Sequence, residues 1–502
     1  MSEANNAGST SGRSSVFFAS FMTLIAAGIG FAVRGQILGD WSAQFGFTKG
    51  ELGQITGGGL TGFGIIIIIG SFFADRVGYK PLMVLAFVLH IFSALVTIAA
   101  TPIFESMGKD AAYACLFWGM FMFAVANGLC EAVINPLTAT LYPKQKTHYL
   151  NILHAGWPGG LIVGGLLAFG FAGRNAMITQ LRWEIPMLFF LVPVLVYGAI
   201  MFKHKFPVSE ARAAGVDMGQ MLVQFASPIL LFLLLLHAMV GYVELGTDSW
   251  ITNIMNNVIS GKAILLFIYT SGLMFILRFF AGPIVEKINP VGLLLASALL
   301  AAGGLYWLGS GMTGMAIFLA GTVYGIGKTF FWPTMLGVVG EQFPKGGAIT
   351  MGMMGGIGML SAGLLGGPGI GYKQDYYATE YLTENNSETY ERYRSEKEYG
   401  FLMFPKISGL DGKKVGDLED KIANNGELTP TEQADKGPIK EATIYGGRMA
   451  LKWTAVVPLA MAVGFLILAL YYRAKGGYQV EVLHGAPPEG EHYTGGVEGP
   501  VE

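Results

Sequence analysis

Residues 127–136 read Asn-Gly-Leu-Cys-Glu-Ala-Val-Ile-Asn-Pro, and residues 324–333 read Tyr-Gly-Ile-Gly-Lys-Thr-Phe-Phe-Trp-Pro. Each stretch carries one ionisable residue five positions before a proline, and the two prolines are 197 residues apart. Two shorter matches occur in the same order, at offsets of 207 and 198 residues: Phe-Phe-Ala from Phe72 and Phe279, and glycine-rich stretches from Gly164 and Ala362. Each match is weak in a glycine-rich chain, but three in one order predict that the chain contains two similar halves.

The composition places both halves in a membrane. Hydrophobic residues make up 52% of the chain and charged residues only 13%, about half of the roughly 25% that is usual in soluble proteins. Of the 66 charged residues, 26 fall within residues 371–448, so the rest of the chain is poorer still in charge. This pattern argues against a cytosolic globular enzyme, a disordered chain and a coiled coil. A net charge of −2 without a long basic run gives no support to nucleic-acid binding.

Twelve stretches are long and apolar enough to cross a bilayer, which takes about 20 residues. They lie near residues 15–38, 53–74, 80–101, 111–141, 148–173, 181–202, 225–248, 262–282, 289–309, 312–340, 346–370 and 449–473. Six spans fall in each half, so the sequence predicts an all-α membrane protein with two six-helix bundles related by a parallel repeat. That repeat is typical of secondary transporters.

The distribution of Lys and Arg predicts the orientation. If the N-terminus is inside, the inner connections and tails carry twelve of these residues and the short outer connections carry five. We therefore expect a multi-pass protein of the cell (inner) membrane with both termini in the cytoplasm. The expected organisation is a tail (1–14), a first bundle (15–202), a linker (203–224), a second bundle (225–475) with an external insertion (371–448), and a disordered tail (476–502). The insertion is expected to be a small cap or a tether, with a solvated loop the simpler reading.

The loop after the second span resembles a signature of the major facilitator superfamily. It reads Asp-Arg-Val-Gly-Tyr-Lys-Pro from Asp75 to Pro81, although Ser71 stands where that pattern has glycine. The resemblance covers essentially the whole chain. It implies alternating access, in which two bundles rock about a central site. It also implies conformational roles for Asp75, Arg76 and Lys80 at the inner helix ends.

Spans four and five are similar to the fucose/galactose/glucose–proton symporter branch of that superfamily. Glu131 is followed by Asn135-Pro136 and later by Leu150-Asn151, at the spacing of that branch. The sequence departs from the branch in two places: His154 replaces a glutamine, and Arg34 lies where span one of the branch carries an aspartate. The resemblance implies a sugar as solute and a proton as the coupling ion.

Asn127, Glu131, Asn135 and Thr138 follow one another at steps of four, four and three residues, so they share one face of span four. Glu131 lies near mid-depth, where an ionised group costs at least about 2.5–3.5 kcal/mol on insertion scales. We predict that Glu131 carries the coupling proton and that Asn127 and Asn135 bind solute. The alternative is a structural carboxyl bonded to a neighbouring helix.

The repeat places Lys328 where the first half has Glu131. Tyr324, Lys328 and Trp332 share a helix face, and we expect that face to line the central cavity with Lys328 approaching Glu131. Alternatively, Lys328 extends toward a lipid headgroup.

Asn151, His154 and Trp157 lie on one arc of span five. A sugar site needs amide or imidazole groups for hydroxyls and an aromatic face for the ring, and these residues supply both. A packed tryptophan and an internally bonded histidine are the alternative.

Arg34, Glu244 and Asp248 lie late in spans one and seven, which are the gating helices of the resembled superfamily. A contact between Arg34 and Glu244 would close the outer gate. The alternative is a set of interface charges bonded to lipid or loop.

The leading hypothesis is a secondary transporter of a small polar solute, a sugar moved with protons, acting as a monomer. An organic-anion carrier is the alternative within transport, because Arg34 and Lys328 supply cations. A non-transporting receptor that uses residues 371–448 is the alternative from another class. The sequence carries no phosphate loop, no metal-binding spacing and no nucleophile–base pair, so neither a cofactor nor enzyme activity is predicted.

Overall fold

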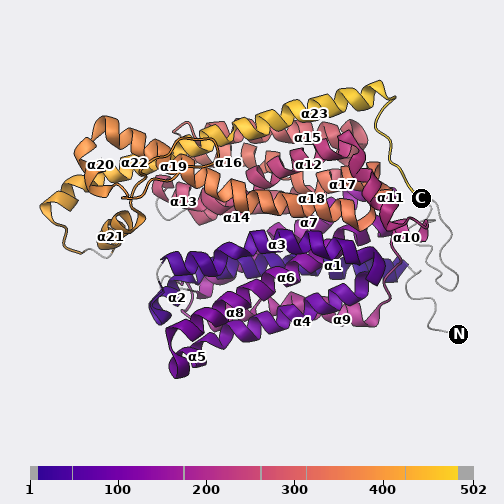
Figure 1. Ribbon diagram of the computed structural model, residues 1–502, viewed down its shortest axis with the longest axis horizontal. Helices are drawn as coiled ribbons and strands as arrows, with labels where there is room; N and C mark the ends of the chain where they lie inside the picture. Colours follow the sequence, from indigo (N-terminus) through magenta and orange to yellow (C-terminus); the bar gives the residue numbers. More distant parts are fainter. Residues whose placement is uncertain are drawn as a thin grey trace.

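The computed structural model describes residues 10–47, 49–172, 176–259, 263–311, 314–423 and 426–483. Its regular elements are helices that form two bundles lying side by side (Figure 1), with α7 and α14 at the boundary between them. Residues 1–9 and 484–502, which include most of the two expected tails, lie outside the described residues.

The first bundle contains six long helices, which correspond to the first six predicted spans. They are α1 (Thr10–Gln36), α3 (Lys49–Val77), α4 (Tyr79–Ile98), α6 (Lys109–Leu141), α7 (Lys146–Phe171) and α9 (Leu191–Lys203). The short helices α2 (Leu38–Phe45) and α5 (Ala100–Met107) follow α1 and α4, and the short α8 (Glu184–Leu188) begins the sixth span, which runs from Glu184 to Lys203. The linker forms α10 (Glu210–Ala213) and α11 (Met218–Val223), followed by the single 3₁₀ turn η1 (Gln224–Ala226).

The second bundle is built from helices that are more often interrupted. It contains α12 (Pro228–Gly241), η2 (Tyr242–Gly246), α13 (Thr247–Ile259), α14 (Ala263–Arg278), α15 (Ala281–Leu308), α16 (Met315–Lys328), α17 (Phe331–Gln342), η3 (Pro344–Gly346), α18 (Gly347–Ser361), η4 (Ala362–Gly366), α19 (Gly367–Asn385), α22 (Pro430–Thr454) and α23 (Val456–Ala474). Within the described residues, eleven helical stretches are long and apolar enough to cross a membrane, and Leu265–Arg278 is a further, shorter apolar helix.

Three kinds of interruption shape the second bundle. The turns η2 and η4 are π-helical, and π-helical turns often occur at functional sites. Helices α16 and α17 are separated at Thr329 and Phe330, which leaves the first amides of α17 without helical partners. The helical path of α15 is broken at Asn289, whose φ is 54°. The amide of Gly282 donates a hydrogen bond to His148 Nδ1 at the start of α7, at 3.0 Å. Residues 281–288 therefore continue the course of α14 along α7.

The insertion is a folded helical extension and not a solvated loop. Helices α19 and α22 project beyond the bundle, and α20 (Ser387–Tyr393) and α21 (Gly412–Ala423) lie against them (Figure 1). Its small core is separate from the main core and contains Ala378, Leu382, Tyr393, Leu418, Ile439 and Ala442. The high charge density of this segment hides the apolar residues that build that core, which is why composition suggested a loop.

The N-terminal end of α1 and the C-terminal end of α23 lie at the same end of the molecule, here called the tail end. The insertion lies at the opposite end (Figure 1). Hydrogen bonds join the two bundles at the tail end. Lys146 Nζ donates to the carbonyl oxygen of Gly340 at 2.9 Å, and the amide of Thr147 donates to Glu341 Oε1 at 2.9 Å. The amide of Ala348 donates to Asp75 Oδ2, also at 2.9 Å. The tail end is therefore closed in this structure.

Candidate functional site

A polar network begins at Glu131, deep in α6. Asn135 lies one turn further along and donates from Nδ2 to Glu131 Oε2 at 2.7 Å. Asn135 Oδ1 lies 2.8 Å from His154 Nε2 on α7. All three side chains are buried, at 4% exposure or less. The structure thus brings together three residues that the sequence analysis assigned to the site.

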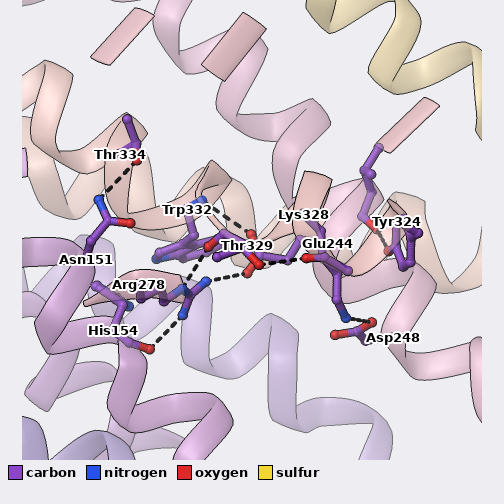
Figure 2. Close-up of polar contacts among 12 residues, drawn as sticks. Asn151, His154, Glu244, Asp248, Arg278, Tyr324, Lys328, Thr329, Trp332 and Thr334 are labelled. Carbon is purple, nitrogen blue, oxygen red and sulfur yellow. Dashed lines mark hydrogen bonds and ion pairs between the residues drawn. The ribbon is translucent and has the colours of Figure 1, made fainter. Parts of the chain in front are cut away.

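Arg278, at the end of α14, carries the network from the first bundle into the second (Figure 2). Its Nη1 donates to the carbonyl oxygen of His154 at 2.6 Å, and its Nε donates to that of Thr329 at 2.8 Å. Its Nη2 forms an ion pair with Glu244 Oε1 at 3.0 Å. Arg278 is 1% exposed, so its charge is held by protein groups from both bundles.

The sequence analysis did not include Arg278 in the site. It lies directly before the Phe-Phe-Ala match and within the predicted eighth span at 262–282. The sequence signal that could have identified it is a charged residue inside a predicted span, which is costly in a membrane and therefore a candidate for a functional role.

Glu244 is positioned by two breaks in regular helix. It lies within the π-helical turn η2, and its Oε2 accepts a hydrogen bond from the amide of Trp332 at 3.3 Å. That amide is one of the unpaired donors at the start of α17, where the helix dipole favours a negative charge. Glu244 is consequently bonded to a guanidinium and to a helix N-terminus.

Lys328, which lies beside Glu244 in Figure 2, forms an ion pair with Asp248. The Lys328 ammonium also lies 5.3 Å from the centre of the Tyr324 ring, and the Tyr324 hydroxyl donates to the carbonyl oxygen of Val243 at 3.0 Å. Lys328 was expected to approach Glu131, but it pairs with Asp248 instead. Lys328 is 1% exposed, so it does not extend toward a headgroup.

Arg34 does not contact Glu244, which is bonded to Arg278 instead. Its guanidinium lies over the Phe123 ring at 3.7 Å and the Phe190 ring at 4.8 Å, inside the first bundle. Within the described residues, none of its three guanidinium nitrogens has a hydrogen-bond partner, although Arg34 is 2% exposed. The contact expected to close an outer gate is therefore absent from this structure.

The remaining predicted solute-binding residues have different surroundings. Asn151 Nδ2 donates across the bundle boundary to Thr334 Oγ1 at 3.1 Å. Trp157 packs on the Phe31 ring at 5.3 Å. Asn127 Oδ1 lies 3.2 Å from His90 Nε2, and the other ring nitrogen of His90 lies 2.9 Å from the Tyr197 hydroxyl. Asn127 therefore belongs to a cluster within the first bundle.

Among the described residues, the polar atoms near the network that lack hydrogen-bond partners include both ring nitrogens of His237 and the Oδ1 atom of Asn151. His237 is fully buried, and its ring lies 4.6 Å from that of Trp332. The amide oxygen of Asn151 can accept a hydrogen bond from a solute. The ring of His237 can donate one hydrogen bond and accept another.

The three residues assigned conformational roles lie away from the network. Asp75 receives the amide of Ala348 from the second bundle. Lys80 Nζ donates to the carbonyl oxygen of His204 at 3.1 Å, and Arg76 is exposed. In the part of the chain that the structure describes, no group of three His, Cys, Asp or Glu side chains is placed to hold a metal ion.

Comparison with known proteins identifies the family. The sequence model of the Major Facilitator Superfamily matches residues 15–367. The chain belongs to the Major Facilitator Superfamily. It is therefore a multi-pass membrane protein and a secondary transporter, not an enzyme, and the predicted fold class is confirmed.

Individual members of the superfamily are similar to this chain at low identity. The cis,cis-muconate transport protein of Acinetobacter baylyi is 27% identical over 182 residues, which are 36% of this chain and 40% of that protein. The E. coli fucose:proton symporter FucP superposes with a TM-score of 0.58 at 14% identity, over 89% of this chain and 98% of that one. The human organic anion transporter MFSD10 superposes with a TM-score of 0.57 at 12% identity, over 90% and 99%. At such identities the two superpositions establish the fold alone.

Proposed function

We propose that this transporter is a proton-coupled symporter in which Glu131 carries the proton. The observation that supports the proposal is a difference among three carboxyl groups in and beside the network, those of Glu131, Glu244 and Asp248. Glu244 is paired with Arg278 and Asp248 with Lys328, whereas the side-chain donor bonded to Glu131 is the neutral amide of Asn135. An ionised carboxylate without a cation is costly in a membrane interior. Glu131 is therefore the carboxyl best suited to the neutral, protonated form in this state.

The position of Glu131 also offers a route from its proton to the movement of the bundles. Asn135 joins Glu131 to the His154 ring, and the backbone of His154 accepts a hydrogen bond from Arg278 of the second bundle. Loss of the proton creates a negative charge that competes with Glu244 for Arg278. That competition would loosen the Arg278–Glu244 pair inside the second bundle and draw Arg278 toward the first bundle, so the contacts between the bundles at mid-depth would change.

A neutral, hydroxyl-bearing solute such as a sugar fits the charge balance of the network. Arg278 and Lys328 are each neutralised by a carboxylate, so neither cation requires a charged ligand. His237 and Asn151 retain free hydrogen-bonding capacity, and Trp332 supplies an aromatic ring beside His237. The resemblance to the fucose–proton symporter branch agrees with this solute class.

A small organic anion is the second candidate, and Arg34 is the observation that favours it. A buried guanidinium without a hydrogen-bond partner among the described residues would gain from an incoming carboxylate. The similar muconate transport protein and the human organic anion transporter MFSD10 are both named for organic anions. Arg34 lies between Phe123 and Phe190 inside the first bundle, so an anion would reach it only after a rearrangement.

We propose the orientation that the Lys and Arg distribution predicts, in which the chain spans the cell (inner) membrane with the tail end facing the cytoplasm and the insertion outside. The structure would then represent a state closed toward the cytoplasm. In that orientation, solute and proton enter from the side of the insertion, and we propose that a single copy of the chain suffices.

Uptake into proteoliposomes tests both parts of the proposal. Radiolabelled hexoses, pentoses and small carboxylates are offered with and without an inward proton gradient. We expect gradient-driven accumulation of a sugar. Glu131→Gln should abolish accumulation but retain exchange of labelled for unlabelled solute, because exchange needs no net proton movement.

Glu105→Gln, which changes an exposed carboxyl on α5, serves as the matched control and should behave like the parent protein. If Glu131→Gln still accumulates solute against a gradient with normal pH dependence, the assignment of the proton to Glu131 is wrong. Accumulation confined to carboxylates would reject the sugar and support the organic anion.

A further inference from the structure

The chain does not leave the bundle after its last long helix. It turns at Gly476 and Gly477, whose φ angles of 94° and 115° are readily adopted only by glycine. Residues 478–483, here called the strap, then run back along the tail end. This segment was expected to belong to a disordered tail, because the sequence from 476 onward is rich in Gly, Pro and Glu.

The strap is bonded to the end of α17 in the second bundle. The Tyr478 hydroxyl donates to Glu341 Oε2 at 2.6 Å, and the amide of Glu481 donates to the carbonyl oxygen of Glu341 at 2.9 Å. Gln342 Nε2 donates to the carbonyl oxygen of Gln479 at 2.6 Å. The Tyr478 ring also packs edge-on against Tyr472 of α23. These contacts fix the first half of the strap.

The far end of the strap reaches the linker and, through it, the first bundle. The amide of Leu483 donates to Glu210 Oε1 at 2.9 Å, and Glu210 Oε2 forms an ion pair with Lys146 Nζ at 2.7 Å. Glu210 and Glu341 each use one carboxylate oxygen for the strap and the other for a residue of the first bundle, Lys146 or Thr147. Lys146 is fully buried, so these bonds are shielded from water.

We propose that the strap is a conformational lock that holds the tail end closed. Opening the tail end must separate Lys146 and Thr147 from Gly340 and Glu341, since those hydrogen bonds join the two bundles there. The strap orients both carboxylates that hold Lys146 and Thr147. It therefore stabilises the closed state relative to the open one, and releasing it shifts the population toward opening. This role is independent of the solute and of the coupling ion.

The rate at which a buried cysteine is alkylated measures opening of the tail end. Met351 is suitable, because it is 2% exposed and lines a small cavity between the bundles together with Lys146 and Glu210. The background carries Cys115→Ser, Cys130→Ala and Met351→Cys, in the full chain reconstituted in liposomes. Tyr478→Phe removes one hydrogen bond and keeps the ring. It should raise the labelling rate about fivefold, the factor that corresponds to about 1 kcal/mol for one net hydrogen bond.

Tyr471→Phe is the matched control, because it changes an exposed tyrosine in the last turn of α23, outside the strap, and should leave the labelling rate unchanged. Two truncations extend the test. A chain that ends at Gly476 lacks the strap and should label more than tenfold faster, since several hydrogen bonds are lost. A chain that ends at Leu483 keeps the strap and should label like the parent.

The unfolding midpoint of each variant in detergent checks that the fold is intact. If Tyr478→Phe and the chain ending at Gly476 both label at the parent rate, the strap does not control the tail end and the proposal is overturned. If only the truncation fails to fold, Tyr478→Phe alone decides the outcome.

Discussion

Arg278 is the residue on which the two bundles depend most directly at mid-depth. Its guanidinium donates to two backbone carbonyls and to Glu244, and a planar fork with several donors suits such a set better than a lysine ammonium would. Both members of the Arg278–Glu244 pair are buried. Removing one member leaves the other charge unpaired, which costs about 3–5 kcal/mol in comparable buried pairs.

Arg278→Gln should therefore lower the thermal unfolding midpoint of the purified transporter strongly, and Glu244→Gln should lower it as well. The double variant should lose less stability than the sum of the two, because no uncompensated charge remains. Arg76→Gln, at an exposed arginine, should change stability by no more than about 0.5 kcal/mol. Additive losses in the double variant would show that the two side chains are not energetically coupled.

At the scale of helices, the second bundle is held together by close backbone contacts at glycine. A Cβ atom at Gly241 of α12 would lie 1.9 Å from the carbonyl oxygen of Gly358 on α18. The neighbouring π-helical turns also approach closely, since a Cβ atom at Gly246 would lie 2.7 Å from the Cα of Gly366. Small residues at such contacts let membrane helices pack tightly, which explains part of the glycine excess in the sequence.

Gly241→Ala should push α12 and α18 apart and destabilise the protein by about 1–3 kcal/mol, the usual range for overpacking. Thermal unfolding of the purified variant measures the loss. Gly272→Ala is the matched control in α14, because a Cβ atom there meets nothing within 4 Å. Equal unfolding midpoints for the two variants would contradict the close contact.

At the scale of the whole molecule, the insertion is a separate folded unit attached to the transporter. Its core is distinct from the main core, and Arg392 bonds Asp435 Oδ1 at 2.6 Å and Oδ2 at 2.9 Å within the insertion itself. The mid-depth network and the tail-end contacts involve none of its residues. We therefore expect the transport chemistry to continue without residues 387–428.

Replacing residues 387–428 with a flexible Gly/Ser linker should leave most of the proton-driven uptake intact in proteoliposomes. A receptor that used this segment for sensing would lose its output instead. Loss of uptake in a variant that keeps its unfolding midpoint and its oligomeric state would show that the insertion takes part in the transport cycle.

The sequence by itself determined the membrane architecture of this protein. Hydropathy identifies the spans because a bilayer requires about 20 apolar residues in a row, which is a local property of the chain. The contact between Glu131 and Asn135 was equally predictable, since residues four apart share a helix face.

Only the tertiary structure decided which buried charges pair. Arg34 was expected to contact Glu244 and Lys328 to approach Glu131, whereas the structure pairs Glu244 with Arg278 and Lys328 with Asp248. These partners depend on how each helix is rotated. In the second bundle the rotation is set by the π-helical turn at Glu244, the break before α17 and the continuation of α14 beyond Arg278. Such breaks arise from packing between helices distant in sequence, so the local pattern that predicts a span cannot predict the face that the span presents.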